Sequence, residues 1–329
     1  MMNWLFGAAR CAVVASIAFG AVTLASPAAK AQQLTEVRVA MLAPSSLLWL
    51  HAIAKDQGFY AERGIAVKEL TAAGSPALLQ AVSSGSVEAG ISVADLAMRA
   101  IDKDAPVVIS GAVLGKSILR LVGGKGVTKV SEMAGKPVTA GGVEGGTANL
   151  MRFLLQRNGV DPRGVQMVAM ANSKDRVVAL QNGQVSGSLL IAPFDTIAQR
   201  DGMKVLDDYT EDYLQTPLIL NKDWAKKDPK SAIALTQATR KAAAFINDPA
   251  NKQKAIDILA AYTKVDRDIC ADSYAFIVEQ QKAIPADLGV SAASLQNLIT
   301  IDRAVGANPA SEKPFELSRY FDPSFLAAK

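Results

Sequence analysis

The feature that most constrains the fold of this chain is an internal repeat. Residues 81–90 (AVSSGSVEAG) align without gaps on residues 179–188 (ALQNGQVSGS), and Gly85 and Gly183 fall at the same place in the two copies. Self-similarity of this kind is typical of a chain built from two related supersecondary units. The sequence therefore predicts two halves of similar design.

Both copies contain the same order of expected elements. In the first copy, hydrophobic patterns predict a strand, a helix, a strand, a helix and a strand over residues 36–43, 47–56, 65–70, 76–84 and 87–93. In the second copy, the counterparts of the first three lie at residues 136–140, 147–158 and 165–170. We expect an α/β fold with two lobes, each a mainly parallel sheet flanked by helices. Because ligands bind beyond the carboxyl ends of parallel strands, two facing lobes would share one cleft.

The strand patterns stop after Lys222, and long helical patterns follow. They cover residues 228–247, 251–261, 266–283 and 291–305. We expect this helical tail to pack mostly on the first lobe. The expected division is a signal peptide over residues 1–31, a first lobe of residues 32–116 plus 219–329, and a second lobe of residues 117–218.

Residues 1–31 have the pattern of a secretory signal peptide. Arg10 ends a short basic region, Cys11–Ala25 is an apolar run, and Ala29-Lys30-Ala31 offers the small residues that a signal peptidase needs. The apolar run stops before the roughly 20 residues that a membrane-spanning helix requires. We expect cleavage before Gln32 and a periplasmic location.

The charge and the scarcity of reactive residues exclude several classes of function. Lys and Arg number 35 against 31 Asp and Glu, a balance that argues against a nucleic-acid-binding protein. Beyond residue 31 the sequence holds one cysteine, Cys270, and one histidine, His51, so a classical zinc site is not expected. Cys270 is expected to pack in the core, and His51 is expected in the core with the wall of the cleft as the alternative. No acid pair and no nucleophile beside a base suggests catalysis. We therefore expect a protein that is not an enzyme and holds no cofactor or metal.

Three junctions between an expected strand and an expected helix carry glycine or serine. They are Ser45-Ser46, Gly74-Ser75 and Gly146-Thr147. Residues 141–146 (GGVEGG) do not have the spacing of a dinucleotide-binding loop, and residues 115–117 lack the preceding glycine of a P-loop. Backbone N–H groups and helix N-termini at the three junctions are nevertheless suited to a small anionic or polar ligand. The alternatives are that residues 141–146 only form a tight turn and that the serines only cap their helices, with Ser75 as the N-cap of its helix.

Further candidates lie on the first helix and after the third strand of each copy. Trp49 either lines the cleft or fills the core beneath it. Ser92-Val93 and Pro193-Phe194 follow corresponding strands, so Phe194 is a candidate pocket residue, with core packing as the alternative. Asp95 and Asp195 come next at matching positions, and helix capping explains both.

Several short motifs carry a resemblance to a known family. They are Gly58-Phe59-Tyr60 with Gly64-Ile65, Gly74-Ser75 with residues 78–81 (LLQA), and residues 84–90 (SGSVEAG). With the signal peptide, the repeat and the helical tail, the chain resembles a periplasmic substrate-binding protein of an ABC importer, of the type 2 fold. More narrowly, over roughly residues 34–260 it is similar to the group that binds alkanesulfonates, taurine, nitrate or thiamine-precursor pyrimidines.

The resemblance implies that the two lobes close over a small molecule and that the closed form docks on an ABC importer permease in the inner membrane. The family's ligand-contacting loops fall on Ser45, Ser46, Gly74, Ser75, Ser92, Val93, Gly146, Thr147, Pro193 and Phe194. No Arg or Lys lies in these loops, so a sulfonate, a carboxylate and a neutral heterocycle all remain open as ligands. Two other functions also remain open. One is the receptor of a tripartite, ion-driven (TRAP-type) importer, and the other is a lyase or pyrimidine-forming enzyme on the same scaffold, although the cysteine-rich motif of such enzymes is absent.

Overall fold

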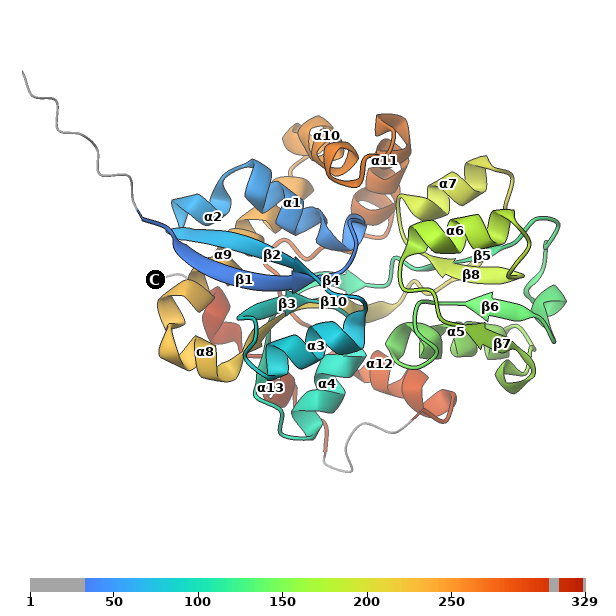
Figure 1. Cartoon of the computed structure of the whole chain (residues 1–329), viewed down its shortest axis with the longest axis horizontal. Helices are drawn as coiled ribbons and strands as arrows, with labels where there is room; N and C mark the ends of the chain where they lie inside the picture. The colour runs from blue at the N-terminus through green and yellow to red at the C-terminus, as the bar shows by residue number, and fades with distance from the viewer. Residues whose placement is uncertain (1–32, 308–313, 328–329) are drawn as a thin grey trace, which may run out of the picture. The chain divides into compact units, whose positions relative to one another are not determined.

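Two five-stranded sheets with equivalent strand order form the framework of the computed structural model (Figure 1). The structure describes residues 33–307 and 314–327, so the expected signal peptide over residues 1–31 lies outside the described residues. Residues from Leu34 onward belong to one unit. No helix among the described residues is both long enough and apolar enough to span a membrane.

The first sheet has the order β2-β1-β3-β10-β4. β1 lies parallel to both of its neighbours, with Val37 opposite Val67 in β2 and Val39 opposite Ala89 in β3. β10 runs antiparallel to β3 and β4. The bounds are β1 (Thr35–Met41), β2 (Ile65–Thr71), β3 (Ala89–Ile91), β4 (Val107–Lys116) and β10 (Asp212–Asn221).

The second sheet repeats this arrangement in the order β7-β6-β8-β5-β9. β6 is parallel to β7 and β8, and β5 is antiparallel to β8 and β9. The bounds are β5 (Arg120–Gly123), β6 (Pro137–Thr139), β7 (Gln166–Val168), β8 (Gly187–Leu190) and β9 (Val205–Asp208). The structure thus confirms the repeat and the α/β class. Each sheet is mixed, because the strand that arrives from the other half of the chain joins its three parallel strands in the antiparallel direction.

The two aligned glycines of the repeat make the same turn. Gly85 and Gly183 have φ angles of +73° and +68°, a left-handed conformation that residues with a side chain rarely adopt. Each follows the helix that crosses back to the third strand of its sheet. This conformation explains why the glycine occurs at the same place in both copies.

Helices cover both faces of each sheet. Figure 1 shows α1 and α2 on one side of the first sheet and α3 and α4 on the other. In the second half, α6 contacts β8 and α7 contacts β5. The bounds are α1 (Trp49–Asp56), α2 (Phe59–Glu62), α3 (Ser75–Ser83), α4 (Ala94–Asp102), α5 (Gly146–Arg157), α6 (Ser173–Gln181) and α7 (Phe194–Arg200), with 3-10 turns η1 (Ser46–Leu48), η2 (Val130–Met133) and η3 (Pro162–Gly164).

The helical tail follows β10. α9 and α10 contact α1, whereas α12 contacts both β10 and α5, and α11 contacts α7. The helix expected over residues 266–283 is interrupted, because α11 gives way to a π-helical segment, η5. The bounds are α8 (Lys222–Lys227), α9 (Pro229–Asn247), α10 (Lys252–Thr263), α11 (Arg267–Tyr274), η5 (Ala275–Gln280), α12 (Ala292–Ala304) and α13 (Leu317–Tyr320), with 3-10 turns η4 (Pro249–Asn251) and η6 (Pro323–Leu326).

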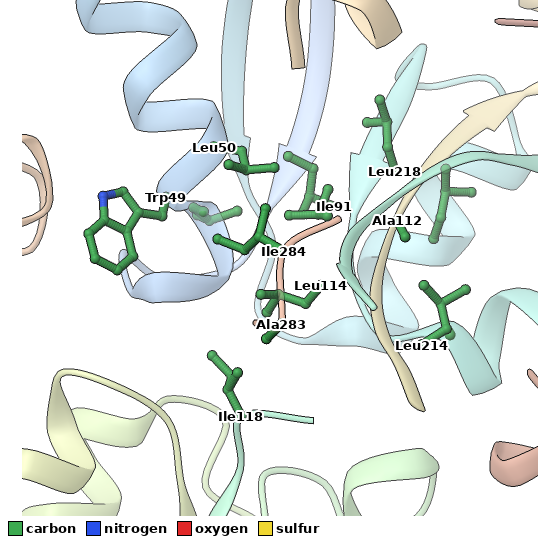
Figure 2. Packing of buried hydrophobic residues seen from close by; sticks show 14 of the residues in the cluster. Trp49, Leu50, Ile91, Ala112, Leu114, Ile118, Leu214, Leu218, Ala283 and Ile284 are labelled. Atoms are coloured by element: carbon green, nitrogen blue, oxygen red, sulfur yellow. The ribbon is translucent and has the colours of Figure 1, made fainter. Parts of the chain in front are cut away.

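The chain passes from the first sheet to the second between β4 and β5, and returns between β9 and β10. The segment between β4 and β5 is buried among apolar side chains. Leu114 and Ile118 are buried and belong to one cluster with Leu214 of β10 (Figure 2). The N–H of Ile118 donates to Oε1 of Gln215 at 2.6 Å, which ties the outgoing and the returning chain together. Residues 212–218, expected in the second lobe, pair in the first sheet. The lobe boundaries themselves stay a prediction.

Candidate ligand-binding site

The candidate residues predicted from the sequence lie mostly at the carboxyl ends of parallel strands. Four segments follow β1, β3, β6 and β8, and we call them the strand-end loops: residues 42–46, 92–93, 140–145 and 191–193. A direct contact joins two of them, because the N–H of Ser46 donates to the carbonyl oxygen of Ala192 at 3.1 Å. The first and the last loop, which belong to different sheets, therefore meet as the two-lobe prediction requires.

Ser45 and Ser46 are buried, but their hydroxyls do not cap a helix. Ser45 holds the N-cap position of η1 without a side-chain hydrogen bond. The Oγ atoms of both serines have no hydrogen-bond partner among the described residues. A buried hydroxyl without a partner is unfavourable, so capping does not explain these serines.

Three more buried hydroxyls without partners lie at the same strand ends: those of Ser92, Thr139 and Thr216. Ser92 directly follows β3, and Thr139 is the last residue of β6. In β10, Leu218 is opposite Ile91, the last residue of β3, so Thr216, two residues before Leu218, lies past the end of β3. Buried hydroxyls from both sheets thus lack a hydrogen-bond partner among the described residues.

Asp95 approaches the N-terminus of α5, although it was expected only to cap its own helix. A Cβ on Gly146 would stand 2.5 Å from Oδ1 of Asp95, so only glycine allows this approach. Nη2 of Arg99 donates to Oδ2 of Asp95 at 2.6 Å. Burial raises the pKa of Asp95, and Arg99 and the N–H groups of Gly146 and Leu96 oppose that rise. A carboxylate of the protein thus lies at the helix N-terminus where we expected an anionic ligand. Ligand binding by Gly146 and Thr147 stays a prediction.

The same helix contacts the helical tail through a second acid. Nδ2 of Asn149 in α5 donates to Oδ1 of Asp302 in α12 at 2.8 Å. Asp302 is 3% exposed, and its burial raises its pKa to about 6. The carboxyl at this contact between α5 and the tail therefore takes up a proton more readily than an ordinary aspartate does.

Asp195 corresponds to Asp95 in the repeat and is also paired with an arginine. Nη1 of Arg120 donates to Oδ2 of Asp195 at 3.2 Å, and the guanidinium carbon of Arg120 lies 3.3 Å from the centroid of the Phe276 ring. Burial raises the pKa of Asp195, against the opposite effect of Arg120. Arg120, Thr196 and Phe276 line a cavity of about 350 Å³ between α7 and η5. Because Asp195 neutralises Arg120, this cavity has no uncompensated arginine at that position.

Arg176 is a residue that the sequence analysis missed. It lies in the first turn of α6, is 4% exposed, and its Nη2 donates to Oγ of Ser173. Its Nε has no hydrogen-bond partner among the described residues. Burial lowers the pKa of Arg176 to about 10. A buried guanidinium beside the loop that follows β6 thus joins the candidate residues. No local motif surrounds residue 176, and its signal in the sequence is the repeat, which aligns Arg176 with Leu78.

Two predicted residues, Gly74 and Ser75, form the junction between β2 and α3. Gly74, not Ser75, is the N-cap residue of α3, and no side chain caps that helix. The expectation that Ser75 is the N-cap is therefore wrong. A Cβ on Gly74 would meet only Pro76 within 4 Å, at 3.8 Å. The junction follows β2, the parallel neighbour of β1, and the N–H of Ala72 donates to the carbonyl oxygen of Met41 at 2.8 Å. Ligand binding by Gly74 and Ser75 stays a prediction.

Trp49 is a core residue in the structure. It is completely buried, and its Nε1 donates to the carbonyl oxygen of Ala255 in α10 at 2.9 Å. Its ring meets that of Tyr274 edge to face, with centroids 6.0 Å apart. Figure 2 labels Trp49 and Leu50 among the buried residues of the apolar cluster. Of the two alternatives for Trp49, the structure favours core packing.

His51 is buried as expected. Its Nδ1 lies 3.1 Å from the hydroxyl of Tyr60, and its Nε2 lies 3.3 Å from Oε1 of Glu69. The hydrogen bond with His51 is the main cause that lowers the pKa of Glu69 to about 2. These contacts hold the imidazole inside the first half of the molecule.

Phe194 also packs in the core. It is buried in the apolar cluster of the second sheet with Val122 and Leu180. The neighbouring Pro193 is buried, whereas Val93 in the first half is half-buried. Residues 92–93 and 193–194 therefore both follow the third parallel strand of their sheet, but this equivalence does not determine where the phenylalanine ring points.

The described residues include no group of three or more His, Cys, Asp or Glu that could hold a metal ion. Cys270 is free and buried, and burial raises the pKa of its thiol to about 11. A thiol with a raised pKa forms little thiolate, which agrees with the packing role expected for it.

Solved structures of similar fold define the class of this protein. The ligand-binding component of an ABC-type import system from Staphylococcus aureus gives a TM-score of 0.73 at 17% identity, over 89% of this chain and 98% of that chain. The alkanesulfonate-binding protein SsuA from Xanthomonas axonopodis pv. citri gives 0.67 at 15% identity, over 83% and 94%. The protein therefore has the fold of the periplasmic binding proteins.

The family follows from the sequence itself. A family model described as "NMT1/THI5 like" matches residues 51–252, and the chain belongs to this family. The nitrate/nitrite binding protein NrtA of Synechococcus elongatus is 28% identical over 121 residues, which are 35% of this chain and 27% of that protein. The match thus spans about a quarter of the length of that relative.

Proposed function

We propose that this protein is the solute-binding receptor of an ABC importer. It captures a small anionic or polar organic molecule, such as a sulfonate, a carboxylate or a heterocycle, between the strand-end loops of the two sheets. It then delivers this molecule unchanged to a permease in the inner membrane. In this proposal residues 1–31 are removed on export to the periplasm, and two lobes, residues 32–116 plus 219–329 and residues 117–218, close over the ligand.

One observation carries the proposal: five buried hydroxyls from both sheets lack hydrogen-bond partners at adjacent strand ends. They belong to Ser45, Ser46, Ser92, Thr139 and Thr216. Each buried hydroxyl without a partner costs about 1–3 kcal/mol, so a folded chain keeps few of them without a use. A polar molecule bound between the two sheets would offer these hydroxyls hydrogen-bond partners.

The similar proteins support a binding role. Their names describe a ligand-binding component of an import system, an alkanesulfonate-binding protein and a nitrate/nitrite binding protein. In the described part of the chain the buried acids Asp95 and Asp195 are engaged by arginines, so neither is placed as an unpaired general base. Binding without turnover agrees with this chemistry.

A thermal-shift screen of the purified protein tests the proposal. The panel contains nitrate, ethanesulfonate, taurine, benzoate, a short aliphatic carboxylate and a pyrimidine. A ligand present at about 100 times its Kd adds about 2.7 kcal/mol to the free energy of unfolding, which is easily seen as a rise in melting temperature. We expect one class of compound to raise the melting temperature and to be recovered unchanged.

Two results would contradict the proposal. Recovery of a chemically altered compound after incubation would indicate an enzyme. Binding that is unaffected by Ser46→Ala and Ser92→Ala would show that the strand-end hydroxyls do not contact the ligand. Ser84→Ala is a matched control, because Ser84 is exposed and its hydroxyl donates to the carbonyl oxygen of Ala81.

A further inference from the structure

We propose that Arg176 is the residue that binds the charged group of the ligand, and that the ligand of this protein is therefore a small organic or inorganic anion bearing a carboxylate, sulfonate or nitrate group. This inference rests on the proposed binding function and narrows it from "anionic or polar" to anionic.

The first support is that the buried charge of Arg176 has no counter-charge. No ion pair in the described part of the chain involves Arg176. The adjacent acid, Asp175, is exposed and is engaged by the side-chain amide of Asn172. Buried arginines in folded proteins are normally paired with an acid, as Arg120 is with Asp195. The missing partner of Arg176 is an anion.

The second support is the position of Arg176 in the repeat. When the gapless alignment of the repeat is extended by three residues toward the N-terminus, Arg176 aligns with Leu78. Leu78 is 0% exposed, and its Cδ2 would stand 2.6 Å from a Cβ on Gly90 in β3. The fold therefore uses this position for an apolar side chain in contact with the sheet. An arginine at a core position of this kind is not explained by packing and points to a binding role.

The third support is the surroundings of the guanidinium. A Cβ on Gly141 would stand 3.5 Å from Nη1 of Arg176, and the N–H of Met170 donates to the carbonyl oxygen of Gly141 at 2.7 Å. Arg176 thus lies beside the loop that follows β6, whose last residue is Thr139 with its unpaired hydroxyl. The charge is therefore at the strand-end edge of the second sheet, where the ligand is proposed to bind.

The electrostatics of α6 add to this argument. Arg176 is in the first turn of the helix, where the positive end of the helix dipole disfavours a cation. Both the burial and the helix dipole therefore make the ligand-free site unfavourable, and an anion relieves both at once. Arginine also binds oxyanions through two parallel N–H groups, and Nε of Arg176 is available for this geometry.

The test uses anions and their neutral analogues of the same shape. Nitrate, ethanesulfonate and benzoate are compared with ethanesulfonamide and benzamide by isothermal titration calorimetry on the wild-type protein and on Arg176→Met. We expect at least one anion to bind, its amide to bind at least about tenfold more weakly, and Arg176→Met to lose about tenfold to 100-fold in affinity for the anion. Arg176→Lys, which keeps the charge but not the planar group, is expected to lose less. Arg163→Met is the matched control, because Arg163 is exposed and paired with Asp161.

A second readout needs no ligand. Because Arg176→Met removes an uncompensated buried charge, the ligand-free variant is expected to melt at the same temperature as the wild type or about 2 °C or more above it. A structural arginine would behave in the opposite way, and a lower melting temperature without ligand overturns the proposal. If no probe binds, this comparison alone decides.

The outcomes also separate this inference from the proposed function. Equal affinity for an anion and its amide, or equal affinity of wild type and Arg176→Met, overturns the role of Arg176 while the receptor function stands. Chemical conversion of a bound anion overturns the receptor function but leaves Arg176 as an anion-binding residue.

Discussion

Oδ1 of Asp95 lies so close to the backbone of Gly146 that a Cβ on Gly146 would stand 2.5 Å from it. Asp95 belongs to α4 beside the first sheet, and Gly146 begins α5 beside the second. The two halves of the molecule therefore meet at this contact, and Gly146 contributes no side chain to it. This contact explains why residue 146 is a glycine, which the sequence alone suggested was needed for a ligand.

The first prediction is that Gly146→Ala destabilises the protein by about 1–3 kcal/mol, because the methyl group overlaps the Asp95 carboxylate. Urea denaturation followed by circular dichroism measures the effect. Gly164→Ala is the control, since nothing lies within 4 Å of a Cβ at Gly164. In an Asp95→Ala background the cost of Gly146→Ala should fall, and an unchanged cost would show that this contact does not limit residue 146.

The second prediction concerns Asp302, whose pKa is raised by burial to about 6 from its ordinary value of 3.8. The folded protein therefore holds a proton that the unfolded chain releases between these two values. The stabilising contribution of this group is complete below about pH 4 and is lost as the pH rises through about 6. Asp302→Asn removes this dependence and can still accept the hydrogen bond from Asn149.

We expect Asp302→Asn to be more stable than the wild type by about 2–3 kcal/mol at about pH 7.5, and the difference to become small near pH 4. Chemical denaturation across this pH range measures it. Glu144→Gln, at an exposed position, is the control for loss of a negative charge. A difference that grows toward acid pH would contradict the raised pKa.

The third prediction separates the core role of Trp49 from a ligand-binding role. Trp49→Phe leaves the carbonyl oxygen of Ala255 without its donor and leaves a small cavity, so it should cost about 1–3 kcal/mol of stability. The affinity for any compound found in the thermal-shift screen should not change. Trp224→Phe, at a half-buried position, is the control and should cost less. A large loss of affinity in Trp49→Phe without loss of stability would indicate instead that Trp49 lines the cleft.

Local patterns predicted most of the backbone, because each element depends on residues close in sequence. The helix expected over residues 147–158 is α5 (Gly146–Arg157), and the strand expected over 136–140 contains β6 (Pro137–Thr139). The repeat was visible in ten aligned residues, since the Gly turns at 85 and 183 require the same backbone conformation. The fold class and the carboxyl-end position of the site followed from these elements.

The partners of individual side chains could not be predicted in the same way. Trp49 bonds to a residue 206 positions away, and the contact of Asp95 with Gly146 depends on how the two sheets are joined. Arg176 did have a signal, because extending the repeat by three positions places it on Leu78, an apolar residue. The replacement of an apolar residue by arginine becomes informative only when the structure shows that Leu78 is fully buried.

The last prediction tests whether the unpaired hydroxyls belong to a binding site rather than to the fold. Ser46→Ala removes a buried hydroxyl that has no partner but keeps the backbone N–H that donates to Ala192. The free energy of unfolding of the ligand-free protein should therefore stay constant or rise by up to about 1 kcal/mol. Ser294→Ala is the same chemical change at a buried serine whose hydroxyl donates to the carbonyl oxygen of Ser291 at 2.7 Å, and it should cost about 1 kcal/mol. The opposite order of the two variants in urea denaturation would mean that the Ser46 hydroxyl stabilises the fold. The expected order, together with weaker ligand binding by Ser46→Ala alone, would assign this hydroxyl to the ligand.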